Sequence, residues 1–285
     1  MLINKPRKSW VSGILTFLTI GLGHIYSGHA QKGIILFFGQ YILSFLCLLT
    51  FFFYTNLIVI FGFLAIVIVY FICCLIDAIK LSKANKAAYE LKKYNRWYFY
   101  LIFWILSAFV IQPVASNAIK KNLIQAYKIP ASSLEPTLLI GDHLLAKKNT
   151  IIKSEFKKGD IIIFPYPEDP SKDFIKRIVA VGGETIKIVD KKVFVNGTLI
   201  NEPYVIHKDP TIIPENFSTR DNLPLFKVPN GSLFVMGDNR DNSHDSRFWG
   251  VVKNSDVKGK ASIIYWSWNK EGYTIRWDRI GTTIN

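Results

Sequence analysis

Cysteine is scarce in this chain of 285 residues and is missing from its second half. The three cysteines, Cys47, Cys73 and Cys74, lie in apolar stretches of the first half, where we interpret them as small apolar side chains in membrane helices. Their distribution excludes a thiol nucleophile, a disulfide framework and a cysteine-ligated zinc site from the second half. We expect neither a metal nor another cofactor.

Acidic residues are almost missing from the first 128 residues, where Asp77 and Glu90 stand against 13 lysines and arginines. The rest of the chain holds 22 basic and 19 acidic residues, so most of the net charge of +14 belongs to the first part. Such a charge can indicate nucleic acid or an anionic membrane surface. Because much of the excess lies in loops between apolar runs, we attribute it to membrane topology and expect no nucleic-acid partner.

Residues 33–76 contain no charge, a run about twice the ~20 residues that a helix needs to cross a bilayer. We expect two spans there, at about residues 33–54 and 57–79, separated by a polar turn. A second charge-free run, residues 97–119, opens with aromatic residues suited to a membrane interface and is expected to form an anchor span, with Pro113 as a site for a kink.

The loop of residues 80–96 carries six lysines and arginines. Short loops rich in these residues favour the cytoplasm, so this loop should lie inside and residues 120–285 on the extracytoplasmic face. Residues 9–31 then fit poorly as a single span, which would place either the basic N-terminus or Lys32 outside. We favour a re-entrant or interfacial hairpin, while a true fourth span and a removable signal peptide stay open. Residues 1–96 thus form an N-terminal membrane module.

From Ile129 onward the pattern changes to short β-rich runs separated by turn residues, with no long amphipathic helix. The Asn196-Gly197 pair within one run is a strong signal for a β-hairpin. We expect an α-helical membrane region followed by a mostly β extracytoplasmic domain over residues 120–285. The expected strands lie at residues 161–164, 185–189, 192–200, 232–236 and 261–266.

Two serines beside prolines, in the segment Pro130-Ala-Ser-Ser-Leu-Glu-Pro-Thr-Leu138, are the first residues that suggest chemistry. On its own this segment could be a turn. A serine hydroxyl is a weak nucleophile and needs a base. Lys176 lies between Ile175 and an apolar run, where loss of water and the adjacent Arg177 cation would favour the neutral amine. A neutral lysine can accept the serine proton.

These segments resemble the boxes of the bacterial type I signal peptidases, membrane-bound Ser/Lys proteases that remove signal peptides from exported proteins. The resemblance places the nucleophile of the first box at Ser133 and the general base, in the box of residues 159–184, at Lys176. The third box, residues 237–247, implies that a serine hydrogen-bonds and orients this lysine. The residues implied to orient the base or support the site are Ser243, Asp245, Arg247 and Arg177.

The resemblance also implies a reaction and a location. Neutral Lys176 would deprotonate Ser133, which attacks the carbonyl of a small residue, and the resulting ester would be hydrolysed by a water that Lys176 activates. The implied fold is a signal-peptidase-like β fold on the periplasmic side of the inner membrane, with membrane lipid and the signal peptides of exported preproteins as partners. The residues implied to wall the shallow substrate pockets are Tyr127, Ile129, Pro130, Leu138, Phe174 and Ile175.

The chain departs from the family at a few positions. Ala131 replaces a serine whose hydroxyl helps to hold the oxyanion in many members, so the oxyanion hole should rest on backbone N–H groups, chiefly that of Ser133. Leu134 replaces the usual methionine, an apolar change of similar volume. His244 lies at a position that varies in the family, and we interpret it as a surface residue.

Two other functions stay open on the sequence alone. A β-rich binding module could keep the boxes without activity, although intact Ser133, Lys176 and Ser243 argue against it. A transporter formed by the membrane half would use intramembrane charges, for which Asp77 is the only candidate. Trp266 either packs in the sheet or faces the membrane, as does Trp268.

Overall fold

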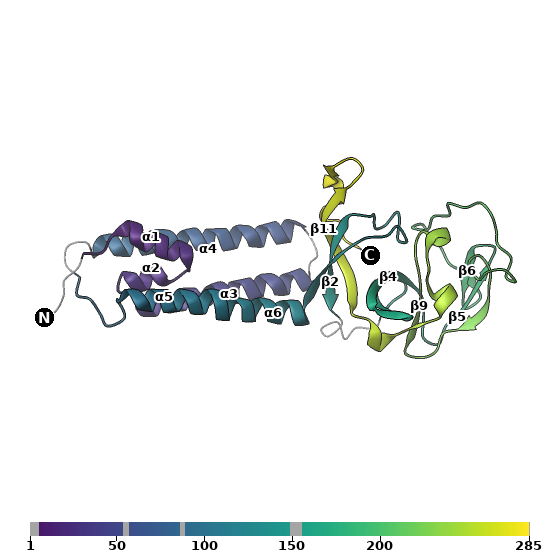
Figure 1. The fold of residues 1–285 in the computed structure, drawn as a ribbon, viewed down its shortest axis with the longest axis horizontal. Coiled ribbons are helices and arrows are strands. Elements are labelled where there is room, and N and C mark those ends of the chain that lie inside the picture. Colours follow the sequence, from purple (N-terminus) through teal and green to yellow (C-terminus); the bar gives the residue numbers. More distant parts are fainter. Residues whose placement is uncertain (1–5, 54–56, 86–88, 149–155, 285) are drawn as a thin grey trace. The chain divides into compact units, whose positions relative to one another are not determined.

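The computed structural model describes residues 6–53, 57–85, 89–148 and 156–284. The chain divides into two compact units, Met1–Ala118 and Ile119–Asn285. We call the first the helical unit and the second the β unit. In Figure 1 the helices of the helical unit run from purple to teal, and the strands of the β unit from teal to yellow.

The helical unit is built from apolar helices. Among the residues that the structure describes, three segments are long and apolar enough to cross a membrane, namely Ala30–Cys47, Phe61–Ala84 and Trp97–Ile119. Many of their large side chains, such as Phe38 and Phe61, are exposed, as expected for a surface that faces lipid. The helices are α1 (Ser9–Leu18), α2 (Leu22–Tyr26), α3 (Ala30–Phe53), α4 (Leu57–Ala84), α5 (Trp97–Leu106), the π-helical η1 (Ser107–Ile111) and α6 (Gln112–Asn122), which runs into the β unit. The expected polar turn at residues 54–56 lies outside the described residues.

The first apolar stretch forms two short helices, α1 and α2, rather than one long helix. At about 1.5 Å per residue they measure roughly 15 Å and 8 Å, against a hydrocarbon core of about 30 Å. Gly21 joins them with a φ of +96°, and a Cβ there would lie 2.2 Å from the carbonyl oxygen of Gly33. Both helices pack against α4, where the buried His24 contacts Asp77 at 2.8 Å from Nε2 to Oδ2.

The β unit holds two antiparallel sheets, so the expected mostly β fold is confirmed. The larger sheet has the strand order β1-β2-β11-β3-β4-β9-β10, with β12 paired to β11, and the smaller has the order β7-β6-β5-β8. Asn196 and Gly197 turn between β6 and β7 with φ values of +52° and +78°, as a tight hairpin requires. The strands are β1 (Ile124–Lys128), β2 (Asp142–Lys148), β3 (Ile161–Tyr166), β4 (Asp169–Val181), β5 (Thr185–Val189), β6 (Lys192–Val195), β7 (Thr198–Leu199), β8 (Leu223–Lys227), β9 (Ser232–Met236), β10 (Val252–Lys253), β11 (Gly259–Asn269) and β12 (Thr274–Ile275).

The core of the β unit explains this arrangement. Alternating apolar residues of β5 and β6, such as Ile186 and Val193, pack in one apolar cluster with residues of β4 and β9. The almost continuously apolar β9 is buried along its length, and β3 over its first four residues. Four short helices cover strand ends: η2 (Arg240–Asn242), α7 (Ser246–Trp249), η3 (Asn254–Asp256) and η4 (Trp277–Arg279).

Candidate active site

Ser133 lies in the turn-rich segment between β1 and β2, which is fixed from two sides. The side chains of Leu134 and Leu138 are fully buried and pack in one apolar cluster with β2, β3 and β11. From the other side, the Asn239 N–H donates to the Ser133 carbonyl at 3.1 Å, and Asn239 Nδ2 donates to the carbonyl of Ser132 at 3.2 Å. The backbone that carries the Ser133 hydroxyl is therefore held in place.

Lys176 reaches this hydroxyl from β4, where it is paired with Ile162 of β3. Its Nζ donates a hydrogen bond to Ser133 Oγ at 2.8 Å. The Lys176 side chain is only 5% exposed, and its Nζ lies 5.3 Å from the centre of the Phe174 ring. The serine and the lysine expected to work together thus lie in direct contact, with the amine shielded from water.

Burial lowers the pKa of Lys176 from 10.5 to about 8. The carboxylates of Asp245 and Asp238 oppose this change, and the positive charge of Arg247 lowers the pKa further. Loss of water is the main cause, as the sequence predicts. The expected contribution of the Arg177 charge was wrong, because the cation that acts on Lys176 is Arg247.

Arg177 does not act on Lys176 because neighbouring residues of a strand point to opposite faces of the sheet. Its guanidinium forms a buried pair with Asp238, at 2.9 Å from Nε to Oδ1 and 2.8 Å from Nη2 to Oδ2. Thr137 Oγ1 donates to the same carboxylate at 2.6 Å. Arg177 therefore joins β4 to the loop after β9 and to the segment that carries Ser133.

A second buried ion pair, between Asp245 and Arg247, lies in the loop after β9. Arg247 Nε is 2.8 Å from Asp245 Oδ1, and Nη2 is 2.9 Å from Oδ2. Burial alone would raise the pKa of Asp245, but the charge and hydrogen bonds of Arg247 hold the pKa below its usual value. Asp245 Oδ2 also accepts from the Gly237 N–H at 3.1 Å, which closes this loop on itself.

Gly237 is a point of very close backbone approach. A Cβ at this position would lie 2.3 Å from Ser243 Oγ and 2.4 Å from the Ser133 carbonyl oxygen. No side chain fits in that space, so glycine lets the loop lie directly against the nucleophile segment.

Ser243 lines the same cleft as Lys176 but does not form the expected hydrogen bond with it. Its hydroxyl lies beside Gly237 and makes no hydrogen bond of normal geometry within the described chain, but it lies close enough to the Asp245 carboxylate to help lower the pKa of that group. The amine of Lys176 is instead directed at Ser133. The sequence motifs and the structure agree that Ser243 and Lys176 share one cleft, but the motifs do not determine which hydroxyl the amine contacts.

The cleft around Ser133 and Lys176 has a volume of about 520 Å³. Four of the expected wall residues, Ile129, Pro130, Phe174 and Ile175, line it. Tyr127 and Leu138 do not, because both pack against the apolar cluster beneath, where Leu138 is fully buried. The further lining residues are Ala131, Ser133, Leu134, Asp173, Lys176, Asp241, Asn242, Ser243, His244 and Phe248.

One rim of the cleft is aromatic, a feature that the sequence did not predict. His244, which we expected to be a surface residue, is half exposed but stacks on Phe248 with ring centres 5.1 Å apart. Its Nε2 lies 3.1 Å from the hydroxyl of Tyr166, whose ring stacks on Phe174 at 4.1 Å. The only sequence signal for this rim is that His244 follows Ser243.

The backbone N–H of Ser133 is available for an oxyanion. Among the residues that the structure describes, no group accepts a hydrogen bond from it. Ala131 is exposed at the cleft and has no side-chain donor. The arrangement therefore offers a backbone donor at Ser133 and no side-chain hydroxyl at position 131.

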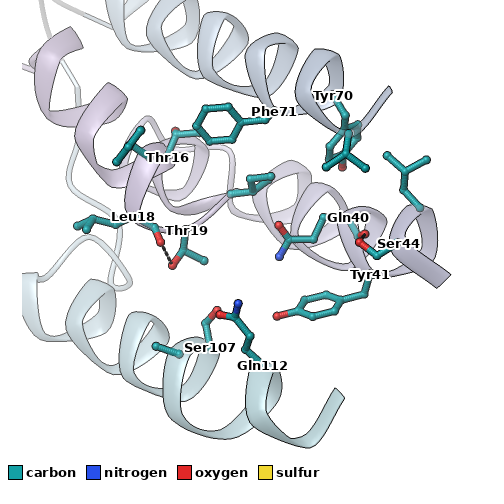
Figure 2. Close-up of a pocket in the computed structure, with 15 residues that line it drawn as sticks. Thr16, Leu18, Thr19, Gln40, Tyr41, Ser44, Tyr70, Phe71, Ser107 and Gln112 are labelled. Carbon is teal, nitrogen blue, oxygen red and sulfur yellow. Dashed lines mark hydrogen bonds between the residues drawn. The ribbon is translucent and has the colours of Figure 1, made fainter. Parts of the chain in front are cut away.

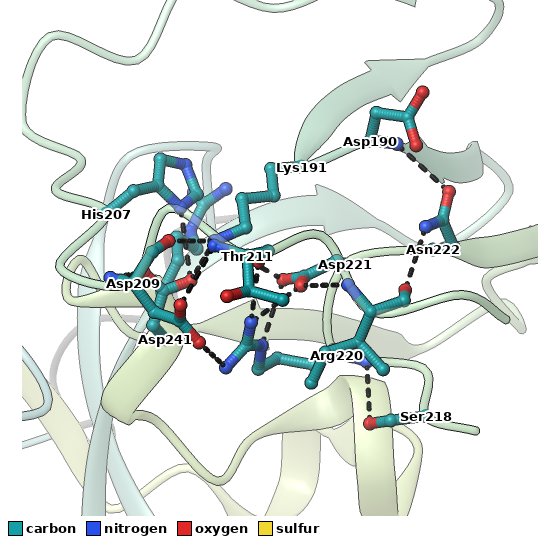
Figure 3. Close-up of polar contacts among 12 residues, drawn as sticks. Asp190, Lys191, His207, Asp209, Thr211, Ser218, Arg220, Asp221, Asn222 and Asp241 are labelled. Atoms are coloured by element: carbon teal, nitrogen blue, oxygen red, sulfur yellow. Dashed lines mark hydrogen bonds and ion pairs between the residues drawn. The ribbon is translucent and has the colours of Figure 1, made fainter.

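A network of charged side chains contacts Asp241, in the loop after β9 (Figure 3). Asp241 accepts hydrogen bonds from Lys191 Nζ at 2.9 Å and from the Asp209 N–H at 2.8 Å. Burial alone would raise the pKa of Asp241, but these bonds lower it to about 2. Arg220 pairs with Asp209, and its carbonyl accepts from Arg247 Nη1 at 2.8 Å. The network connects the β5–β6 turn and the long loop before β8 to the Asp245–Arg247 pair.

Comparison with known proteins gives consistent matches. The sequence profile of a family described as "Signal peptidase, peptidase S26" matches residues 101–266. A signal peptidase I of Aquifex aeolicus is 36% identical over 200 residues, covering 52% of this chain and 78% of the relative. A signal peptidase I of Pseudomonas fluorescens is 29% identical over 233 residues, covering 67% of this chain and 78% of the relative. The crystal structure of a signal peptidase I from Enterococcus faecalis is 29% identical, covers 38% of this chain and 97% of that one, and gives a TM-score of 0.31.

We predict that Gly237→Ala displaces Ser133 from Lys176. The new methyl group would overlap the Ser133 carbonyl oxygen, so in a crystal structure of the variant the distance between Ser133 Oγ and Lys176 Nζ should exceed the wild-type 2.8 Å by several tenths of an ångström. Gly62→Ala is the control, because a Cβ at Gly62 meets no atom within 4 Å. An unchanged distance in Gly237→Ala would show that the loop can yield elsewhere.

Proposed function

The chain belongs to the signal peptidase family, peptidase S26, and on this basis we propose that it is a membrane-bound serine endopeptidase that removes signal peptides from exported preproteins. The observation that carries the proposal is the 2.8 Å contact between Ser133 Oγ and the buried, readily deprotonated amine of Lys176. We assign Ser133 as the nucleophile and Lys176 as the general base.

In the proposed reaction, the neutral Nζ of Lys176 accepts the proton of Ser133 Oγ as the oxygen attacks the carbonyl carbon of the residue before the cleavage site. The Ser133 N–H stabilises the oxyanion that forms. The ammonium of Lys176 then gives its proton to the leaving amine, and the C–N bond breaks to leave an ester on Ser133. Lys176, neutral again, takes a proton from a water that attacks the ester, and returning this proton to Ser133 Oγ restores the enzyme.

The groups around this pair have separate proposed roles. Asp245 and Arg247 position the loop after β9, and the Arg247 charge helps to keep Lys176 neutral. Arg177 holds β4 through Asp238. We assign to Ser243 the task of orienting the Lys176 amine when it turns from Ser133 toward water, since its buried hydroxyl lies in the same cleft and close to the Asp245 carboxylate, whose charge acts on that amine.

The cleft walls support a preference for small side chains. Ile129 and Ile175 present apolar surface beside Ser133, and Phe174 closes the space near the amine. An alanine side chain can be buried in such a shallow site, whereas a bulky one would overlap the wall. Membrane lipid is the other proposed partner. We propose no nucleic-acid partner.

We propose a multi-pass protein of the bacterial inner membrane with its β unit on the extracytoplasmic face. The apolar segments of α3, α4 and α5–α6 cross the bilayer, and the short α1 and α2 re-enter on the cytoplasmic side as part of the module of residues 1–96. Exposed aromatic side chains of the β unit suit lipid contact; Trp266 and Trp277 lie 6.5 Å apart and are 37% and 71% exposed.

Replacing either member of the dyad should abolish cleavage. In Ser133→Ala and Lys176→Met, kcat on a preprotein in lipid vesicles should fall by about 10³-fold or more, because nucleophilic and base catalysis are both lost. Ser171→Ala and Lys187→Met, at exposed positions of β4 and β5, are the matched controls and should retain wild-type rates. Cleavage by Lys176→Met at a near-normal rate would rule out the assigned base.

The rate should also depend on pH in a defined direction. Because Lys176 must be neutral and its pKa is about 8, kcat/KM should rise with pH, reach half of its maximum near pH 8 and level off above pH 9. At pH 6 it should be lower by about 100-fold. Cleavage of one preprotein across this range is the measurement, and a midpoint near 10.5 would contradict the role of burial.

Labelling of single cysteines in intact cells tests the orientation. After Cys47, Cys73 and Cys74 are changed to alanine, Ser171→Cys should react with a membrane-impermeant maleimide added outside, because it lies in the β unit. Lys93→Cys, in the basic loop, should react only after the membrane is permeabilised. The reverse pattern would place the site in the cytoplasm.

A further inference from the structure

The helical unit contains a pocket of about 340 Å³ between the end of α1, α3, α4 and the helix formed by α5, η1 and α6 (Figure 2). These helices are strongly apolar, yet more than half of the side chains that line the pocket carry a hydroxyl or an amide. The polar lining residues are Thr16, Thr19, Gln40, Tyr41, Ser44, Tyr70, Ser107 and Gln112. None of the described lining residues is charged.

Some of these groups are already satisfied by the protein. Tyr70 donates to the carbonyl of Leu36 at 2.7 Å, and Ser44 and Thr16 each donate to a carbonyl four residues earlier in their own helix. Hydroxyls that donate to backbone carbonyls in this way have little hydrogen-bonding capacity left for a ligand.

Four other polar side chains have no such partner. Within the described part of the helical unit, Gln40, Tyr41, Ser107 and Gln112 make no side-chain hydrogen bond, although Ser107 is only 5% exposed. Figure 2 shows the four side chains directed toward one another across the space between α3 and η1. Unpaired hydrogen-bonding groups at membrane depth are costly, so their convergence is the mark of a binding site.

The π-turn of η1 is what brings two of them together. The Gln112 N–H donates to the carbonyl of Ser107, five residues earlier. In an α-helix of 3.6 residues per turn, residues five apart would differ by about 140° around the axis, so they would lie on different faces. The wider turn places Ser107 and Gln112 on one face, next to Pro113, which has no N–H to continue the α-helical pattern.

The chemistry of the lining defines the class of ligand. Amide and hydroxyl groups can both donate and accept, whereas a charged head would find no counter-charge and would pay a large desolvation cost. Phe17 and Leu18, at the rim, are 73% and 52% exposed and offer apolar surface for a hydrocarbon chain. An uncharged polar head on an apolar chain fits both features.

We propose that this pocket binds the head of a neutral lipid, with hydroxyl or carbonyl groups paired to Gln40, Tyr41, Ser107 and Gln112. The site is separate from the peptidase dyad and does not depend on the function proposed for it. Diacylglycerol is a suitable probe, since its head carries one hydroxyl and two ester carbonyls and no charge.

The test uses the full chain in lipid nanodiscs with a diazirine-bearing diacylglycerol. Labelling, mapped by mass spectrometry, should concentrate on α3 and on η1–α6, and dioleoylglycerol should compete while equal amounts of anionic dioleoylphosphatidylglycerol should not. Gln40→Leu and Gln112→Leu should each weaken half-maximal competition by roughly fivefold or more, the effect of one lost hydrogen bond. Gln31→Leu, on the same helix α3 but outside the pocket, should behave as wild type.

An unchanged melting temperature of the helical circular-dichroism signal in nanodiscs would show that these variants still fold. Three results would overturn the proposal. The first is equal competition by the anionic lipid, and the second is labelling that neither glutamine substitution changes. The third is the absence of specific labelling, which would mean that the pocket holds only water. Competition by a preprotein but not by dioleoylglycerol would overturn it too and would assign the pocket to the substrate.

Discussion

The shielding of the Lys176 amine from water is the constraint on which the rest of the β unit depends. Lowering its pKa from 10.5 to about 8 disfavours the charged form by about 3 kcal/mol. At neutral pH a lysine with an unshifted pKa would be neutral several hundred times less often than Lys176, so it would rarely be able to accept a proton from a serine. The buried β3 and β4, the Phe174 ring and the segment around Leu134 together remove water from this one atom.

Because water is excluded from this site, the other buried charges near it also need partners of opposite charge. Each of the two carboxylates whose charge raises the pKa of Lys176, Asp245 and Asp238, is paired with an arginine in two-point contact. An unpaired carboxylate in either position would stabilise the ammonium and raise the pKa of Lys176 again. Buried ion pairs of this kind add little net stability, but losing one partner is costly because a bare charge remains. Here the two ion pairs hold the loop after β9 in place without adding net charge to the cleft.

The sequence allowed much of this to be predicted, and the failures have physical reasons. The box residues gave the contact between Ser133 and Lys176, and alternation with turn signals gave the strands that carry it. The contribution of Arg177 was misjudged because adjacency in sequence means opposite faces in a strand. Leu138 was assigned to the cleft because a sequence motif shows which residue is present but not how deeply its side chain is buried. The aromatic rim escaped notice because it joins Tyr166 and His244, which only the fold brings within 3.1 Å.

The order of these parts along the chain has a consequence for timing. The hydroxyl, the amine and the cation that keeps the amine neutral come from Ser133, Lys176 and Arg247, and Gly237 must fit against the Ser133 carbonyl before the set is complete. A chain made from its N-terminus therefore exposes its serine long before that serine has a working base. In the proposed mechanism, proteolytic competence therefore begins only when nearly the whole polypeptide has emerged and folded.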